Sequence, residues 1–231
     1  MVLTASGSAA ITTLYNFSTS VASAESDWTN IGTDSAATAL SVETINGVAN
    51  TSVLRTGATS DITLQTNLGT IDYVTDNVES IDINFTIVGL DSAATGNIRY
   101  FGFEISDGST SVEQWFALSQ SAYDYWTTST NASKFDTLNG PVTTRTYAIV
   151  DATTDPFVGD YTSSASFDLA AAGFSTSSDL SLTLLGGNVV GGSALSGTYG
   201  YTNLRVTAVP EPTALTLLGL GGLALVTRRR R

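Results

Sequence analysis

The sequence of 231 residues contains no cysteine and no histidine. A Ser-His-Asp triad, a cysteine nucleophile, a thiolate or imidazole zinc site and a disulfide framework therefore all lack their parts. No window carries the hydrophobic period of a convincing amphipathic helix, and residues 170–174 offer one helical turn at most. A folded body must therefore be held by a hydrophobic core built without long helices.

Basic residues are also scarce, with 9 Lys and Arg against 21 Asp and Glu and a net charge of -12. Four of the nine are the last four residues, so the chain up to Val209 has 20 acidic and 5 basic side chains, a net charge of -15. Such a surface repels phosphate backbones, so we expect no nucleic-acid partner. It also favours solubility.

Strand-sized runs of alternating or β-branched residues recur along the chain, with Gly, Asn, Asp and Ser between them. About eleven strands within residues 11–208 predict one all-β domain, a two-sheet β-sandwich of the jelly-roll kind, similar to concanavalin or laminin-G domains. The predicted strands are residues 11–17, 38–45, 51–56, 61–66, 80–90, 97–106, 111–119, 144–151, 161–169, 179–187 and 199–209.

The run NIRYFGFEISDGSTSVEQWFALS, residues 97–119, predicts a hairpin. With Asp107-Gly108 as a two-residue turn, Phe103 faces Val112 and Tyr100 faces Trp115. A loop with an odd number of residues would move the second strand's side chains to the other face. The predicted core face carries Phe101, Phe103, Ile105, Val112, Phe116 and Leu118.

The opposite face of this hairpin gathers Tyr100, Glu104, Glu113 and Trp115. Aromatic rings beside carboxylates suit a sugar, because a ring stacks on the pyranose while the acids accept hydroxyl protons, so we treat these four as a candidate glycan-binding site. The alternative is that both aromatic residues form a second layer covered by another segment. Two carboxylates on adjacent strands also have a spacing that glycosidases use. No residue is assigned as catalytic, because acids are common over this whole surface.

One loop, DATTDPFVGD, offers oxygen ligands for a structural calcium ion in Asp151, Asp155 and Asp160. Their spacing does not match an EF-hand loop, and a solvated loop explains them equally well. No other cofactor is expected.

The C-terminal residues differ in character from the body. Thr213 to Thr227 is a run of 15 residues without charge, preceded by Pro210-Glu211-Pro212 and followed by Arg228, Arg229, Arg230 and Arg231. A helix of this length covers about 22 Å, short of a hydrocarbon core of about 30 Å. Clustered arginines stay on the cytoplasmic side, which places the acidic body across the membrane. We expect the prolines to end the preceding strand and hold Glu211 in an extended linker; the alternative is a buried C-terminal helix.

This arrangement resembles the PEP-CTERM sorting domain of exported bacterial proteins. Over residues 209–231 the resemblance implies that Pro210, Glu211 and Pro212 are the recognition motif, that Thr213 to Thr227 forms a hydrophobic transmembrane helix, and that Arg228 to Arg231 form the cytoplasmic stop. It implies a partner, the membrane protease and transpeptidase called exosortase. It also implies transient tethering to the inner membrane and delivery to the cell surface or extracellular matrix. The nucleophile would belong to the exosortase.

The N-terminal residues 1–10 lack the basic and apolar regions of a signal peptide, although Ser8-Ala9-Ala10 has the small residues of a cleavage site. We interpret residues 1–10 as the remnant of a signal peptide whose start lies upstream, with a polar N-terminus as the alternative.

Two functions follow for the body. The first is a non-catalytic structural or adhesive surface protein, with extracellular polysaccharide as a candidate ligand. The second is a secreted carbohydrate-active enzyme that uses paired carboxylates.

Overall fold

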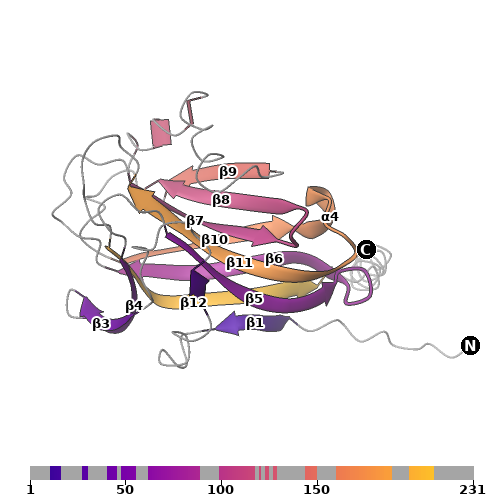
Figure 1. Ribbon diagram of the computed structural model, residues 1–231, viewed down its shortest axis with the longest axis horizontal. Helices are drawn as coiled ribbons and strands as arrows, with labels where there is room; N and C mark the ends of the chain where they lie inside the picture. Colours follow the sequence, from indigo (N-terminus) through magenta and orange to yellow (C-terminus); the bar gives the residue numbers. More distant parts are fainter. Residues whose placement is uncertain are drawn as a thin grey trace, which may run out of the picture.

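A computed structural model of the chain describes residues 11–16, 28–30, 41–45, 48–55, 62–88, 99–117, 120, 123–124, 127–128, 144–149, 160–188 and 198–210. Over these residues the chain forms two sheets packed face to face (Figure 1). The prediction of an all-β, two-sheet sandwich is confirmed, while its finer assignment as a jelly roll stays a prediction. Residues 1–10, the loop carrying Asp151 and Asp155, and residues 211–231 lie outside the described residues.

The first sheet has the strand order β10-β6-β12-β4-β3, and β1 pairs with β12 beside this path. All its described pairings are antiparallel. Its strands are β1 (Thr12–Asn16), β3 (Ser41–Ile45), β4 (Val48–Arg55), β6 (Val78–Val88), β10 (Asp160–Asp168) and β12 (Thr198–Pro210).

The second sheet has the order β2-β5-β11-β7-β8-β9, in which β8 and β9 run parallel and the other described pairs are antiparallel. Its strands are β2 (Thr29–Asn30), β5 (Ile62–Asp72), β7 (Arg99–Ser106), β8 (Ser111–Ala117), β9 (Thr144–Ile149) and β11 (Ser177–Asn188). Each of the eleven predicted strands has its counterpart here, and only the two-residue β2 was missed.

The core lies between the sheets, where side chains from alternate positions meet. Phe85 of β6 in the first sheet packs on the rings of Phe101, Phe103 and Phe116 in the second, with centroids 5.0 to 5.5 Å apart. All four rings are fully buried. The predicted core face of the 97–119 hairpin is thereby confirmed for its described side chains; Leu118 lies outside them.

The hairpin between β7 and β8 departs from its predicted register. Ser106 faces Ser111, so the loop has four residues, and Glu104 lies directly opposite Glu113. Asp107 closes this loop: its Oδ1 accepts hydrogen bonds from the backbone N–H groups of Ser109 and Thr110, at 2.8 and 2.7 Å. The predicted pairings of Phe103 with Val112 and Tyr100 with Trp115 are therefore wrong. The predicted two-residue loop and the observed four-residue loop both have an even number of residues, so each side chain of β8 stays on its predicted face of the sheet.

A single described turn of helix, α4 (Leu169–Ala172), follows β10 at one end of the sandwich (Figure 1). Asp168 caps it by accepting a hydrogen bond from the Ala171 N–H at 2.8 Å. Gly173 ends it in the left-handed conformation that glycine favours, with φ of 81°. This agrees with the single turn expected for residues 170–174. None of the described helical residues forms an apolar helix of membrane-spanning length.

Candidate functional site

The outer face of the second sheet carries a row of polar residues that crosses five strands. Each member lies directly opposite the next in the strand register. We call this set the polar row; it consists of Gln65 (β5), Thr183 (β11), Glu104 (β7), Glu113 (β8) and Arg145 (β9).

The row follows from the period-2 alternation of the strands. Leu64, Leu184 and Phe103 are neighbours of row residues and point into the core, so Gln65, Thr183 and Glu104 point away from it. Thr183 and Glu113 are nonetheless almost completely buried, each with 1% of its surface exposed. The centre of this outer face is therefore covered.

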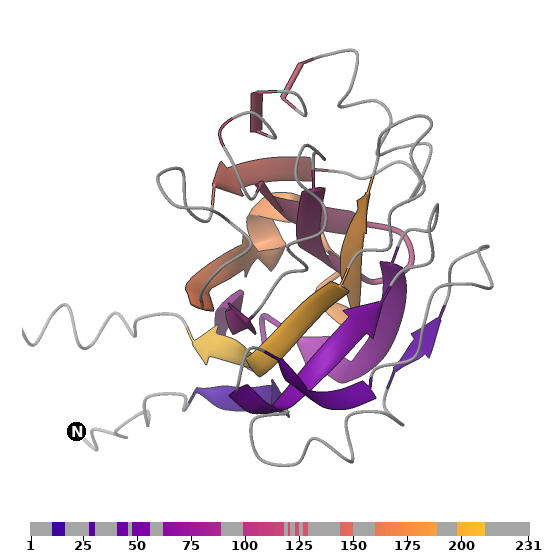
Figure 2. The ribbon, with the colours of Figure 1, turned by 90° about the vertical axis from the view of Figure 1, so that its left-hand side faces the viewer.

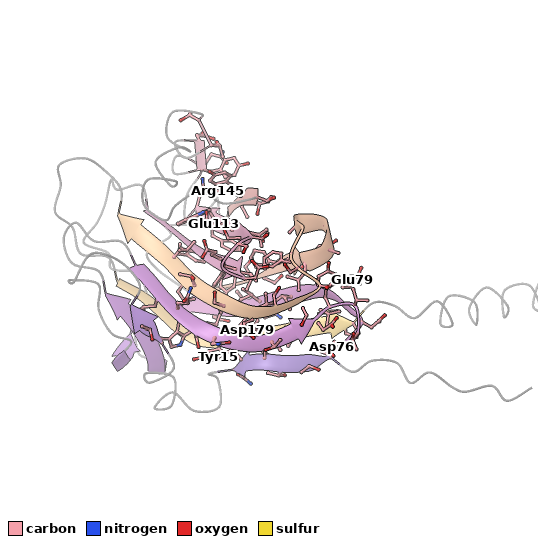
Figure 3. The ribbon with its side chains drawn as sticks, turned by 45° about the vertical axis from the view of Figure 1, so that its right-hand side comes forward. Tyr15, Asp76, Glu79, Glu113, Arg145 and Asp179 are labelled. Atoms are coloured by element: carbon pink, nitrogen blue, oxygen red, sulfur yellow. The ribbon has the colours of Figure 1, made fainter. Side chains whose placement is uncertain are left out.

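At one end of the row, Glu113 is held by two donors. Arg145 Nε and Trp115 Nε1 each donate a hydrogen bond to Glu113 Oε2, both at 2.6 Å. Figure 3 shows Arg145 and Glu113 side by side on the neighbouring strands. The second oxygen, Oε1, accepts no hydrogen bond from any described residue. The Arg145 guanidinium and the Glu113 carboxyl group therefore form a buried ion pair.

Glu104 has a different environment. Thr183 donates a hydrogen bond from Oγ1 to its Oε1 at 3.3 Å, and Gln65 Nε2 donates to Thr183 Oγ1 at the same distance. Burial and the nearby negative charge of Glu113 raise the pKa of Glu104 from 4.5 to about 7, against the opposing influence of Thr183 and Arg145. The row thus combines a carboxyl group that holds its proton near neutrality with a carboxylate paired to arginine.

Trp115 lies over the backbone of β7 rather than open to solvent. Only 1% of its surface is exposed, and a Cβ added to the opposing Gly102 would come within 3.1 Å of the Trp115 ring atoms Cδ2 and Cε3. This placement favours the interpretation in which Trp115 belongs to a covered second layer. Glu104, Glu113 and Trp115 do share one face as predicted, and the backbone of Tyr100 pairs with Ala117 on the same strands. Sugar binding by these residues stays a prediction.

The candidate calcium ligands are placed only in part. Among the described residues, no group of three or more acidic side chains is arranged to hold a metal ion. Asp160 begins β10 and pairs with Val88 through its backbone, whereas Asp151 and Asp155 fall outside the described part. Calcium binding therefore stays untested.

A second site lies where β12 ends. Pro210 is the last residue of β12 and lies opposite Val78, after a register shift between Val209 and Pro210. β12 therefore extends one residue beyond the predicted strand and ends at Pro210, while the linker expected at Glu211 lies outside the described residues. At such an irregularity, proline needs no ladder hydrogen bond from its missing N–H. Glu211, the centre of the predicted motif, is therefore the next residue after a paired strand.

The edge of β12 is covered by two different strands. Residues 198–201 pair with β4, and residues 205–208 pair with β1, with Thr12 opposite Ala208 and Thr13 opposite Thr207. On the other side, β6 pairs along nearly the whole of β12. Figure 2 shows β1 beside the gold end of β12. The first residue of β1 lies opposite the end of β12. These two strand ends lie at the same end of the sandwich as α4 (Figure 1).

Comparison with known families identifies one match, the PEP-CTERM protein-sorting motif, at residues 208–231. No curated protein matches the chain. The matched region begins at Ala208, which is buried within β12, and includes the Pro-Glu-Pro sequence and the terminal arginines. The chain is thus a PEP-CTERM motif-containing protein, an exported protein with a C-terminal sorting signal fused directly to an all-β sandwich.

Proposed function

We propose that this protein is processed by an exosortase at the inner membrane and delivered to the cell surface or extracellular matrix. There its sandwich has a non-catalytic structural or adhesive role. The observation that carries the proposal is the sorting motif at residues 208–231, whose first three residues are the last three of strand β12. The acidic body supports export as a soluble domain, since its negative charge keeps it off anionic lipid surfaces.

The experiment is fractionation of cells with and without the exosortase, using antibodies to the sandwich and to the terminal arginines. We expect a shortened chain at the surface only when the exosortase is present. A Glu211→Ala chain should accumulate at full length in the inner membrane, whereas Glu79→Ala, which changes an exposed acid on β6, should be processed like the unaltered chain. A single uncleaved product in the cytoplasm would contradict the proposal.

A second candidate, a secreted carbohydrate-active enzyme, draws support from the unequal environments of Glu104 and Glu113. A protonated carboxyl beside a carboxylate is the pairing that glycosidases use. Burial of Glu113 and its ion pair with Arg145 weigh against it, because a nucleophile or base must reach the substrate. Hydrolysis of a glycan by the unaltered chain that is lost in Glu104→Gln would favour this candidate.

A further inference from the structure

We propose that β1 controls access to the sorting motif: its pairing with residues 205–208 of β12 closes the strand edge that the sorting enzyme needs to engage. This inference rests on the proposed function, because it concerns how an exosortase reaches its motif. It follows from the register that places Thr12 opposite Ala208, the first residue of the matched motif.

The argument starts from the backbone. A protease commonly binds its substrate as an extended strand, through main-chain hydrogen bonds along a free edge. While β6 and β1 flank residues 205–208, their backbone groups are used on both sides. Release of β1 alone would free one edge of β12 over residues 205–208, up to three residues before Glu211, and leave the pairing with β6 intact. The enzyme could then bind the motif without unfolding the sandwich.

The contacts of β1 are suited to local opening. The strand has five residues, and its register with β12 shifts between Thr13 and Tyr15. Thr12 and Thr13 are exposed, and Arg205 Nη2 donates a hydrogen bond to Thr13 Oγ1 at 3.2 Å. Short strands with exposed side chains and an irregular ladder open at lower cost than core strands.

One aromatic contact anchors the far end of β1. Trp28 Nε1 donates a hydrogen bond to the Tyr15 hydroxyl at 2.7 Å, and the two rings meet edge to face with centroids 5.4 Å apart. Trp28 is buried and immediately precedes β2 of the other sheet. This contact therefore contributes to holding β1 against the sandwich, together with the packing of Leu14 and Tyr15 on the core.

A cavity of about 380 Å³ lies beside the paired ends of β1 and β12, and is lined by Thr12, Leu14, Thr70, Ile71, Asp76, Val78, Ala208 and Pro210. Thr12 and Ala208 both face it, as directly opposed residues of an antiparallel pair should. The space accommodates a cross-link between these two positions.

The absence of cysteine makes that cross-link a clean test. Directly opposed residues on antiparallel strands have Cα atoms about 4.5 to 5.5 Å apart, within the range of a disulfide. The test variant is Thr12→Cys with Ala208→Cys. The matched control is Asn84→Cys with Ser164→Cys, an exposed opposed pair between β6 and β10. Both are expressed as full chains in cells with the exosortase, and disulfide formation is read from gel mobility with and without reductant.

We expect the Thr12–Ala208 cross-link to slow release of the tail by about tenfold or more, because it prevents local opening, and the control cross-link to leave the rate unchanged. Tyr15→Phe, which removes the hydrogen bond from Trp28, should speed release by about twofold to tenfold. Equal rates for the cross-linked and unaltered chains would overturn the role of β1, as would failure of the two thiols to pair. An unaltered chain that keeps its tail would instead contradict the proposed function, and with it this inference.

Discussion

Glu104 and Glu113 lie directly opposite each other on β7 and β8, yet their side chains have different hydrogen-bond partners. Arg145 and Trp115 donate hydrogen bonds to Glu113, whereas Thr183 donates a hydrogen bond to Glu104. Like charges at opposed positions destabilise a sheet. The raised pKa of Glu104 and the Arg145 partner of Glu113 both reduce this repulsion.

The first prediction concerns pH. The pKa of Glu104 is about 7 in the folded chain and 4.5 in the unfolded chain. Its contribution to the free energy of unfolding is therefore fully present below pH 4.5 and is lost as the pH rises through 7. The loss is up to about 3 kcal/mol.

The measurement is urea unfolding of the full chain across this range, with Glu104→Gln as the comparison. Glutamine cannot ionise. The difference in unfolding free energy between the unaltered chain and Glu104→Gln should therefore change with pH between 4.5 and 7. A difference that stays constant with pH would show that Glu104 titrates normally.

The second prediction concerns the buried ion pair. Arg145→Met leaves the buried Glu113 carboxylate without its arginine partner, and should cost about 3 to 5 kcal/mol of unfolding free energy. Adding Glu113→Gln to Arg145→Met should recover part of this loss, because the uncompensated charge is gone. A double-mutant cycle from chemical unfolding measures the coupling. Additive losses would mean that the two side chains do not act as a pair.

The third prediction concerns Gly102. A Cβ at this position would lie 2.7 Å from the backbone oxygen of Gln114 and against the Trp115 ring. Gly102→Ala should therefore destabilise the chain by about 1 to 3 kcal/mol. Ser164→Ala, an exposed strand substitution, should change stability by less than about 0.5 kcal/mol. The measurement is the midpoint of thermal unfolding of Gly102→Ala and of Ser164→Ala. Equal midpoints would contradict the close approach of the Trp115 ring to Gly102.

The fourth prediction concerns the loop that fixes the hairpin register. Burial alone would raise the pKa of Asp107, but hydrogen bonds from Thr110, Ser109 and Ser175 lower it overall. Its stabilising contribution is therefore present above its ordinary pKa of 3.8 and is lost as the pH falls through the lower folded value. Asp107→Ala should cost about 1 to 2 kcal/mol at neutral pH, and Asp107→Asn less, because asparagine retains an acceptor. Equal urea midpoints for the two variants would contradict this role.

Alternation of apolar and polar residues was enough to predict the strands and the two faces of the β7–β8 hairpin. It missed β2 because two residues cannot display a period. It missed the register because the Asp107 side chain, rather than a two-residue turn, closes the loop.

The partners of the two glutamates had no local signal in the sequence. Arg145 reaches Glu113 from 32 residues away, through a parallel pairing that short-range patterns do not specify. Thr183 reaches Glu104 across 79 residues. By contrast, the sorting motif is a continuous segment whose residues carry the resemblance by themselves, so it could be recognised without the fold.

The most direct test of export and sorting is the C-terminal sequence of the protein recovered from the cell surface, read by mass spectrometry of its last peptide. The proposed function predicts that this peptide lacks Arg228 to Arg231 and the apolar run before them when the exosortase is present. A surface protein that ends at Arg231 under those conditions would contradict it.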